Sequence, residues 1–317
     1  MFKFGMYKLG LFLTNLLSWP FSYRCATFIS DCHYVLSFRD RWAVKNNLKV
    51  IFPDADPQDI SRLTREVFRN FGRYLNEFFR MAKHINKEYV QKHIKVEHLK
   101  HILKALERGK GGIILTAHLG NWELGGVVLG ILGYPVTAIA LSHKERPVNE
   151  LFNKQRAVQG FNVVPMNFAI RKCTELLKKN QLVAIAADRD FTQSGEEIDF
   201  LGRKTLIPKG AAMFSLRTGA AIIPTFFLRD KEEGQFVLSI EEPILPPLEV
   251  PREEEREEVL KLMKRYSKII EDKIRTYPAQ WLMFRPFWIQ NSDVQPDIAL
   301  PNTFLPRETV LQTRISE

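Results

Sequence analysis

The chain has 317 residues, of which 45% are hydrophobic and 26% charged, so it can bury a sizeable core. Disorder as the main state is excluded, because the apolar fraction can form this core. A collagen-like repeat and a disulfide scaffold are excluded, because there are only 17 Gly, 17 Pro and 3 Cys. The formal net charge of +10 favours a polyanionic partner, such as nucleic acid, an anionic membrane surface or an acidic protein.

The N-terminal segment is both apolar and basic. An uncharged stretch from Leu9 to Tyr23 covers 15 residues, which is too short to cross the hydrocarbon core comfortably. Residues 1–52 carry seven Lys and Arg against two Asp, and their aromatic residues suit a membrane interface. We expect residues 1–36 to form an apolar helical hairpin that anchors the protein on anionic lipid. The alternative is a helix pair packed on the core of the domain.

Beyond this segment, helical and strand patterns alternate. A long amphipathic helix is predicted from Pro57, with Asp56 as its N-cap, to about Lys83, and a second helix at about 97–108. Strands are predicted at 112–116, 136–141, 162–165, 182–187, 221–228 and 236–240, helices at 121–132, 150–159, 170–179, 209–218 and 251–275, and a loop at 195–206. This alternation predicts an α/β fold with a mostly parallel central sheet and helices on both faces.

The sequence divides into three parts on this interpretation. Residues 1–52 form the N-terminal membrane-associating helical segment, residues 53–290 the α/β domain, and residues 291–317 a loosely ordered tail.

One segment, Thr116-Ala-His-Leu-Gly-Asn-Trp-Glu123, leaves a buried strand and enters a helix. Parallel sheets place their sites at such carboxyl ends of strands. In the pair His118 and Glu123, a carboxylate one helical turn away can orient the imidazole and stabilise its protonated form. Such a histidine takes a proton from a hydroxyl that attacks a carbonyl. The alternative is a core histidine beside a glutamate in the first turn of a helix.

Two further polar clusters begin where predicted strands end. One runs from Ser142 to Pro147 and continues at Arg156. The other comprises residues 188–191, followed by 199–204 and 208–210. Both are expected to open onto the same edge of the sheet as His118. Their Arg and Lys side chains can hold phosphates, and the alternative is that both are solvated loops.

Other chemistries are disfavoured. The sequence contains no HExxH, no zinc-type cysteine spacing, no GxxxxGK[ST] and no GxGxxG, which disfavours metal hydrolysis, nucleotide-driven chemistry and hydride transfer. Basic residues are not interleaved with aromatic residues in a way that favours base stacking, so nucleic acid is not an expected partner. Cys173 is expected to be a buried thiol within a helix.

Taken together, these blocks resemble the lipid A late acyltransferases, the lauroyl/myristoyl acyltransferase family, which is related to the glycerol-phosphate acyltransferases. The resemblance covers about residues 5 to 290 and rests on Asn47-Leu48, Phe52-Pro53, residues 109–123, Arg156 and residues 187–190, 199–202, 208–210, 218–224 and 278–282. The segment 283–288 and the loop after Asp190 depart from the family or vary within it, so the acceptor stays open.

The resemblance implies an acyltransferase at the cytoplasmic face of a bacterial inner membrane. It would move a fatty acyl group from the phosphopantetheine thioester of acyl carrier protein, or from CoA, to a hydroxyl of a lipid A precursor. His118 is the expected general base, Glu123 orients it, and N–H groups at the start of the 120–132 helix receive the oxyanion. Neither a metal nor a further cofactor is required, because the thioester is already activated. The expected substrate-binding residues are Asn121, Arg156, Asp188, Arg189, Asp190 and Arg203.

The expected partners are acyl carrier protein, an anionic membrane and a phosphorylated glycolipid acceptor. Two alternatives stay open. The acceptor can be another glycolipid or a lysophospholipid, such as a phosphatidylinositol mannoside. A non-catalytic membrane scaffold is the other alternative, and the intact His118 and Glu123 pair argues against it.

Overall fold

A seven-stranded sheet lies at the centre of the computed structural model, which describes residues 2–141, 145–157, 160–191, 195–230 and 235–288. The strand order is β1-β9-β8-β2-β5-β3-β4, and every pair is parallel except β8 with β9. Its strands are β1 (Ile94–Glu97), β2 (Gly112–Thr116), β3 (Val136–Ala140), β4 (Phe161–Pro165), β5 (Leu182–Ala186), β8 (Ala221–Arg229) and β9 (Phe236–Ile240). The predicted α/β fold with a mostly parallel sheet is confirmed.

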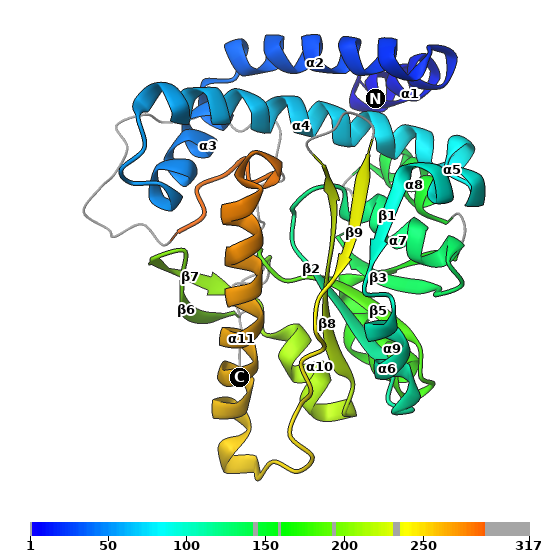
Figure 1. Cartoon of the computed structure of the whole chain (residues 1–317), viewed down its shortest axis with the longest axis vertical. Coiled ribbons are helices and arrows are strands. Elements are labelled where there is room, and N and C mark those ends of the chain that lie inside the picture. The colour runs from blue at the N-terminus through cyan, green and yellow to red at the C-terminus, as the bar shows by residue number, and fades with distance from the viewer. Residues whose placement is uncertain (1, 142–144, 158–159, 192–194, 231–234, 289–317) are drawn as a thin grey trace, which may run out of the picture.

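Helices cover both faces of the sheet (Figure 1). One face packs against α6 (Lys100–Glu107), α7 (Trp122–Ile131) and α8 (Arg146–Arg156), and the other against α9 (Ala169–Lys178), α10 (Gly210–Thr218) and α11 (Glu255–Thr276). Successive residues of a strand point to opposite faces, so Ile114 and Ala184 belong to the first apolar cluster and Ile113 and Ile185 to the second. Burial on both faces explains why these strands read as continuous apolar runs.

The sheet divides at its carboxyl edge between β3 and β5. These two strands pair only from Val136 to Ala138 and from Leu182 to Ala184. Each stays paired for two further residues with its other neighbour, because β2 and β5 pair up to Thr116 and Ala186 and β3 and β4 up to Ala140 and Pro165. The strands β3 and β5 therefore separate beyond Ala138, next to the strand end that leads to His118.

The long helix α4 (Pro57–His84) lies between the sheet and two N-terminal helices, α1 (Phe2–Leu16) and α2 (Trp19–Leu36) (Figure 1). Asp56 is its N-cap, as predicted, and accepts a hydrogen bond from the Gln58 N–H at 2.7 Å. The helices α2 and α4 are in close contact, since a Cβ on Gly72 would lie 2.8 Å from the carbonyl oxygen of Ala26. The N-terminal helices α1 and α2 are therefore packed on the domain through α4.

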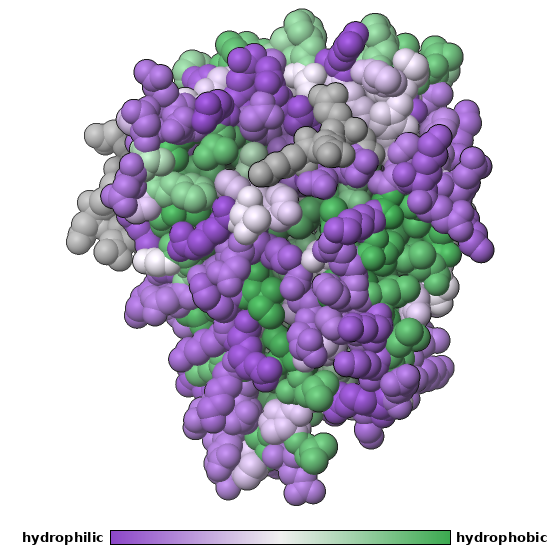
Figure 2. Space-filling view, in the orientation of Figure 1, coloured by the Kyte–Doolittle hydropathy of each residue, from purple (hydrophilic) through white to green (hydrophobic). Residues whose placement is uncertain are grey.

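The same two helices expose apolar side chains on their outer side, and Figure 2 shows apolar residues over α1 and α2 along one edge of the molecule. No helix among the described residues is both long enough and apolar enough to span a bilayer. A third helix, α3 (Phe38–Ile51), buries Val44, Leu48 and Ile51 in the cluster that also holds α11. The proposed boundary after residue 52 stays a prediction. The exposed apolar residues of α1 and α2 are Met6, Leu9, Phe12, Leu13, Leu16, Phe21, Phe28, Ile29, Val35 and Leu36.

Two segments differ from the sequence prediction. The helix predicted at about 97–108 is α6 (Lys100–Glu107), but α5 (Lys87–His93) and β1, which precede it, were not predicted. The predicted loop 195–206 is an antiparallel hairpin of β6 (Glu196–Phe200) and β7 (Arg203–Ile207). Buried and more exposed side chains alternate along both strands. The buried ones are Ile198 and Phe200 in β6 and Thr205 and Ile207 in β7. The predicted tail at 291–317 lies outside the described residues.

Candidate active site

His118 lies in a tight turn between β2 and α7. Its carbonyl oxygen accepts a hydrogen bond from the Leu282 N–H at 2.8 Å, and the Gly120 N–H donates to the Gln280 carbonyl at 3.0 Å. Gly120 has a φ of 67°, and a Cβ there would lie 2.1 Å from the carbonyl oxygen of Phe227. Glycine is therefore required at this position, both for its backbone angle and for the close approach of β8.

The ring of His118 is held by Asp188, which follows β5. Nδ1 lies 2.8 Å from Oδ1 of Asp188, and the His118 N–H donates to both carboxylate oxygens at 3.0 Å. Oδ2 also accepts a hydrogen bond from Nε1–H of Trp281 at 3.0 Å. Burial alone would raise the pKa of Asp188, but its interactions with His118 and Trp281 outweigh that effect and hold the pKa below its usual range. Asp188 is thus an ionised, buried acceptor.

This arrangement sets the tautomer of His118. Because Asp188 accepts a hydrogen bond at Nδ1, the ring proton lies there and Nε2 carries the lone pair of a base. The ring also contacts the edges of Trp122 and Phe191, with centroids 4.9 and 6.3 Å away, and Trp122 stacks on Tyr74 of α4 at 4.7 Å. The side chain of His118 is 17% exposed, so a substrate hydroxyl can reach it from the cavity described below.

Glu123, the expected partner of His118, instead binds Arg156 of α8. Nε and Nη2 of Arg156 donate to the two carboxylate oxygens at 2.8 and 2.5 Å, and both residues are buried. Burial would lower the pKa of Arg156, yet the charge and hydrogen bonds of Glu123 raise it above its usual value. The H-x4-E spacing does not equal one helical turn here, because α7 begins only at Trp122 and Gly120 is in a left-handed conformation.

The side chain of Asn121 binds within the protein and stabilises the start of α7. Its Oδ1 caps α7 by accepting from the Leu124 N–H at 3.0 Å, and its Nδ2 donates to Glu77 of α4 at 2.7 Å. Glu77 is 1% exposed, accepts a hydrogen bond from the hydroxyl of Tyr23 at 2.8 Å and forms an ion pair with Arg229. The expected substrate-binding residue Asn121 therefore belongs to a buried network that joins α2, α4 and β8 to the start of α7.

The remaining expected site residues separate into two groups. Arg189 and Asp190 line the cavity beside His118, and Oδ2 of Asp190 accepts from the Gly195 N–H at 2.8 Å. Arg203 is exposed in the β6–β7 hairpin and is not among the residues that line the cavity. Residues 142–144 of the Ser142–Pro147 cluster lie outside the described residues.

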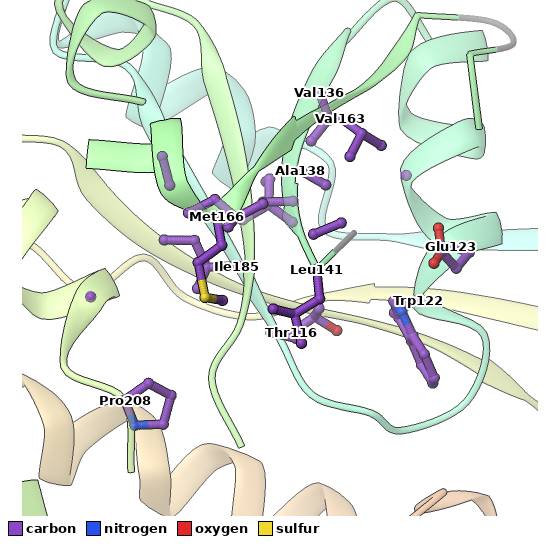
Figure 3. A pocket seen from close by; sticks show the side chains of 18 of the residues that line it. Thr116, Trp122, Glu123, Val136, Ala138, Leu141, Val163, Met166, Ile185 and Pro208 are labelled. Atoms are coloured by element: carbon purple, nitrogen blue, oxygen red, sulfur yellow. The ribbon is translucent and has the colours of Figure 1, made fainter. Parts of the chain in front are cut away.

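A cavity of about 570 Å³ opens beside His118 (Figure 3). One part of it lies between the sheet and α7, and we call this part the enclosed arm. Gly125 and Gly126 line it and let α7 lie close to the sheet, since a Cβ on Gly126 would be 2.5 Å from the ring of Phe161. The enclosed arm is also lined by Ile114, Leu129, Val136, Ala138, Phe161, Val163, Ala184 and Phe227.

Two buried polar atoms that line this cavity have no hydrogen-bond partner among the described residues. They are Oγ1 of Thr116, at the end of β2, and Nη1 of Arg156. Two of the main-chain donors expected for the oxyanion are already used, because the N–H groups of Gly120 and Asn121 bond to Gln280 and Phe227. Buried donors without partners are costly in a resting protein, so both atoms are available to a bound substrate.

Other reactive groups play no part in this geometry. Cys173 is buried in α9, and burial raises the pKa of its thiol to about 11, so the sulfur is protonated near neutral pH. Within the described ranges, no group of three or more His, Cys, Asp or Glu side chains is placed to hold a metal ion.

The sequence is similar to two lipid acyltransferases over three quarters of its length. It is 29% identical to the phosphatidylinositol mannoside acyltransferase of Mycolicibacterium smegmatis over 75% of each chain, and 25% identical to the lipid A biosynthesis palmitoleoyltransferase of Escherichia coli, also over 75% of each chain. A solved structure, the 1-acyl-sn-glycerophosphate acyltransferase PlsC from Thermotoga maritima, superimposes on 78% of this chain and 96% of its own, with 18% identity and a TM-score of 0.34.

A family profile extends over nearly the whole described chain. The profile of the bacterial lipid A biosynthesis acyltransferases matches residues 3–290, which include His118, Asp188 and the segment around Trp281. The resemblance drawn from the sequence blocks is confirmed. This chain is an acyltransferase and belongs to the bacterial lipid A biosynthesis acyltransferase family.

Proposed function

We propose that this enzyme transfers a fatty acyl group from a thioester to a hydroxyl of a glycolipid at an anionic membrane surface. The observation that carries the proposal is the position of His118, which has its Nδ1 held by ionised Asp188 and lines a largely apolar cavity. Nε2 would accept the proton of the acceptor hydroxyl as that oxygen attacks the thioester carbonyl. Asp188 would then stabilise the imidazolium that forms.

The second half of the reaction uses Thr116 and, again, His118. The carbonyl oxygen becomes negatively charged in the tetrahedral intermediate, and the Thr116 hydroxyl is a donor available to it. When the carbonyl reforms, the carbon–sulfur bond breaks and the thiolate receives the proton from His118. The donor chain would occupy the enclosed arm, whose apolar lining suits a hydrocarbon. The donor itself is carried on the phosphopantetheine of acyl carrier protein or on CoA.

For the acceptor we propose a phosphatidylinositol mannoside or a related phosphorylated glycolipid in preference to a lipid A precursor. Sequence similarity supports this order, because the identity is 29% to the mannoside acyltransferase and 25% to the lipid A palmitoleoyltransferase over equal shares of the chain. The formal net charge of the protein, +10, suits both an acidic carrier protein and a phosphorylated acceptor lipid.

The apolar side chains exposed on α1 and α2 are proposed to enter the headgroup region of the membrane. Since the seven basic residues of segment 1–52 outnumber its two Asp, anionic lipid would strengthen this contact. We propose that the protein lies on the cytoplasmic face of a bacterial inner membrane as a peripheral or monotopic enzyme.

The experiment is acyl transfer by the purified protein. Palmitoyl thioesters of acyl carrier protein and of CoA are each offered with a phosphatidylinositol mannoside, a lipid A precursor or a lysophospholipid, and products are identified by mass spectrometry. We expect a new ester on the mannoside, and none with folded His118→Ala. Transfer only to the lipid A precursor would reverse the order of acceptors. If the thioester is left intact with every acceptor, the proposed reaction is wrong.

A further inference from the structure

The cavity beside His118 does not end at the sheet. It continues through the division between β3 and β5 to the opposite face, because its lining includes Ile139 and Ile185, whose side chains point away from α7. In Figure 3, Met166 and Ile185 lie to one side of the strands, and Trp122 and Glu123 lie to the other. We call this second part the open arm. Its wall is formed by Ile139, Met166, Ile170, Ile185, Met213 and Phe214.

The open arm reaches solvent, and apolar side chains are exposed at its mouth. Ile170 is 73% exposed and Leu141 is 43% exposed, and both line the cavity. Phe168, between Met166 and Ile170 in sequence, is 64% exposed. In the described chain beyond residue 52, only three other large apolar side chains are exposed, namely Leu103, Leu245 and Leu248. Such clustering beside a cavity is typical of a surface that an apolar ligand covers.

The chemistry of the open arm favours a hydrocarbon over the carrier's phosphopantetheine. A phosphopantetheine brings two amides and a phosphate, which need hydrogen-bond partners when they leave water. The wall offers mainly methyl, methylene and thioether groups. Two cations beside it, Lys209 and Arg217, are paired with Glu196 at 3.0 Å and Glu255 at 3.4 Å. An aliphatic chain needs no such partners.

We propose that the open arm binds a hydrocarbon chain that the acceptor lipid already carries, while the donor chain fills the enclosed arm. This inference rests on the proposed function and adds a site to it. His118 lines the same cavity as the residues of both arms, so the acceptor hydroxyl can reach Nε2 with the two chains on opposite faces of the sheet. The two lipids then bind at the same time and do not compete for one channel.

Two measurements test this proposal, with Ile170→Asn/Met213→Gln as the variant and Leu248→Asn as its control. Ile170 and Met213 line the open arm, whereas Leu248 is 95% exposed and is not a lining residue. In steady-state transfer, we expect the variant to raise the KM for dipalmitoyl phosphatidylinositol mannoside about ten-fold. The KM for the donor and the rate with the deacylated mannoside should stay at wild-type values. A higher donor KM with an unchanged acceptor KM would show that the open arm binds the phosphopantetheine of the donor, and this result would overturn the proposal.

The second measurement needs no turnover. A palmitoyl thioether of CoA fills the donor site, and binding of the dipalmitoyl mannoside is followed by titration. The wild-type protein should bind both together, and the variant should bind the mannoside at least five-fold more weakly. Mutual displacement of the two lipids, or equal binding by the wild-type protein and the variant, would show that the open arm is not a second chain site. Absence of transfer with every acceptor would instead refute the proposed function, and the titration would still decide this inference.

Discussion

Asp188 holds both the main chain and the ring of His118. Its carboxylate accepts the His118 N–H at 3.0 Å and the Nδ1–H at 2.8 Å, while Trp281 donates to the same carboxylate at 3.0 Å. The side chain of Asp188 has no exposed surface, so no water competes for these bonds. One residue thereby fixes the position, the tautomer and the charge balance of the proposed base.

We expect Asp188→Asn to lower the rate of acyl transfer by a factor on the order of 10² to 10⁴. An asparagine amide beside Nδ1 favours the tautomer with the proton on Nε2, and that tautomer cannot accept the hydroxyl proton. The double variant with His118→Ala should be little slower than His118→Ala alone, because the two residues act as a unit. Rates are measured at saturating donor on proteins whose unfolding transitions match the wild type. A folded Asp188→Asn enzyme at near wild-type rate would contradict this mechanism.

The depressed pKa of Asp188 makes a separate prediction about stability in acid. A carboxyl group with a lower pKa in the folded state stabilises the fold at any pH above its unfolded-state value, about 3.9. That contribution is lost as the pH falls through the folded-state pKa. The difference in unfolding free energy between wild type and Asp188→Asn should therefore shrink between pH 5 and pH 3. Denaturant titrations at both values measure it, and a difference that stays constant would refute the assignment.

Much of the fold could be predicted from the sequence because its signals are local. The N-cap Asp56 and the apolar stripe that follows indicated α4 directly, and the apolar runs at 112–116 and 182–187 indicated buried strands. The β6–β7 hairpin was missed because its turn, Leu201-Gly202, lies among charged residues that read as a loop. Strand β1 has only 4 residues, too few for a clear period.

The partner of His118 could not be predicted in the same way, because it depends on the order of strands. Asp188 is 70 residues away in sequence and is placed by β5, which lies between β2 and β3. The sequence grouped Asp188 with the site, but proximity along the chain favoured Glu123 as the partner. The Ala187–Asp190 block was the signal that pointed to Asp188, and only the strand order shows which of its residues contacts the imidazole.

The ion pair of Glu123 and Arg156 predicts an effect on stability. Their side chains are only 6% and 10% exposed, so removing one partner leaves a buried charge. We expect Glu123→Gln to destabilise the fold by about 3–5 kcal/mol, and Glu123→Gln/Arg156→Met to recover part of that loss. Denaturant midpoints measure both. If Glu123→Gln changes the unfolding free energy by less than about 1 kcal/mol, the pair is not a buried structural link.

Thr116 is expected to act on the rate rather than on binding. Its hydroxyl is buried, lines the cavity and has no partner among the described residues, so Thr116→Val removes a donor at nearly constant shape. If that hydroxyl stabilises the oxyanion, kcat should fall on the order of 10² with KM unchanged, and Thr116→Ser should retain most of the activity. Wild-type kcat in Thr116→Val would assign the oxyanion to other donors.

The last prediction concerns the membrane contact of α2. Deleting residues 1–36 would be a poor test, because Tyr23 bonds to buried Glu77 and α2 packs closely on α4, so the deletion exposes the core. Phe28→Ser/Ile29→Ser/Leu36→Ser avoids this problem, since these side chains are 69%, 65% and 78% exposed. We expect this triple variant to keep the wild-type unfolding transition and to bind vesicles of anionic lipid more weakly, because three of the apolar side chains that contact the membrane are removed.

Flotation with vesicles measures that binding, and Leu103→Ser on α6, at a site 46% exposed, is the matched control that should float like the wild type. Salt separates the two contributions to binding. At 1 M salt the Debye length falls to about 3 Å, so the attraction of the basic segment to anionic lipid is screened while the apolar contact persists. The wild-type protein should therefore be released only in part, and the triple variant, which keeps the exposed apolar side chains of α1 but has lost three on α2, should be released to a larger extent. Complete release of the wild type would mean that the exposed apolar side chains of α2 do not enter the membrane.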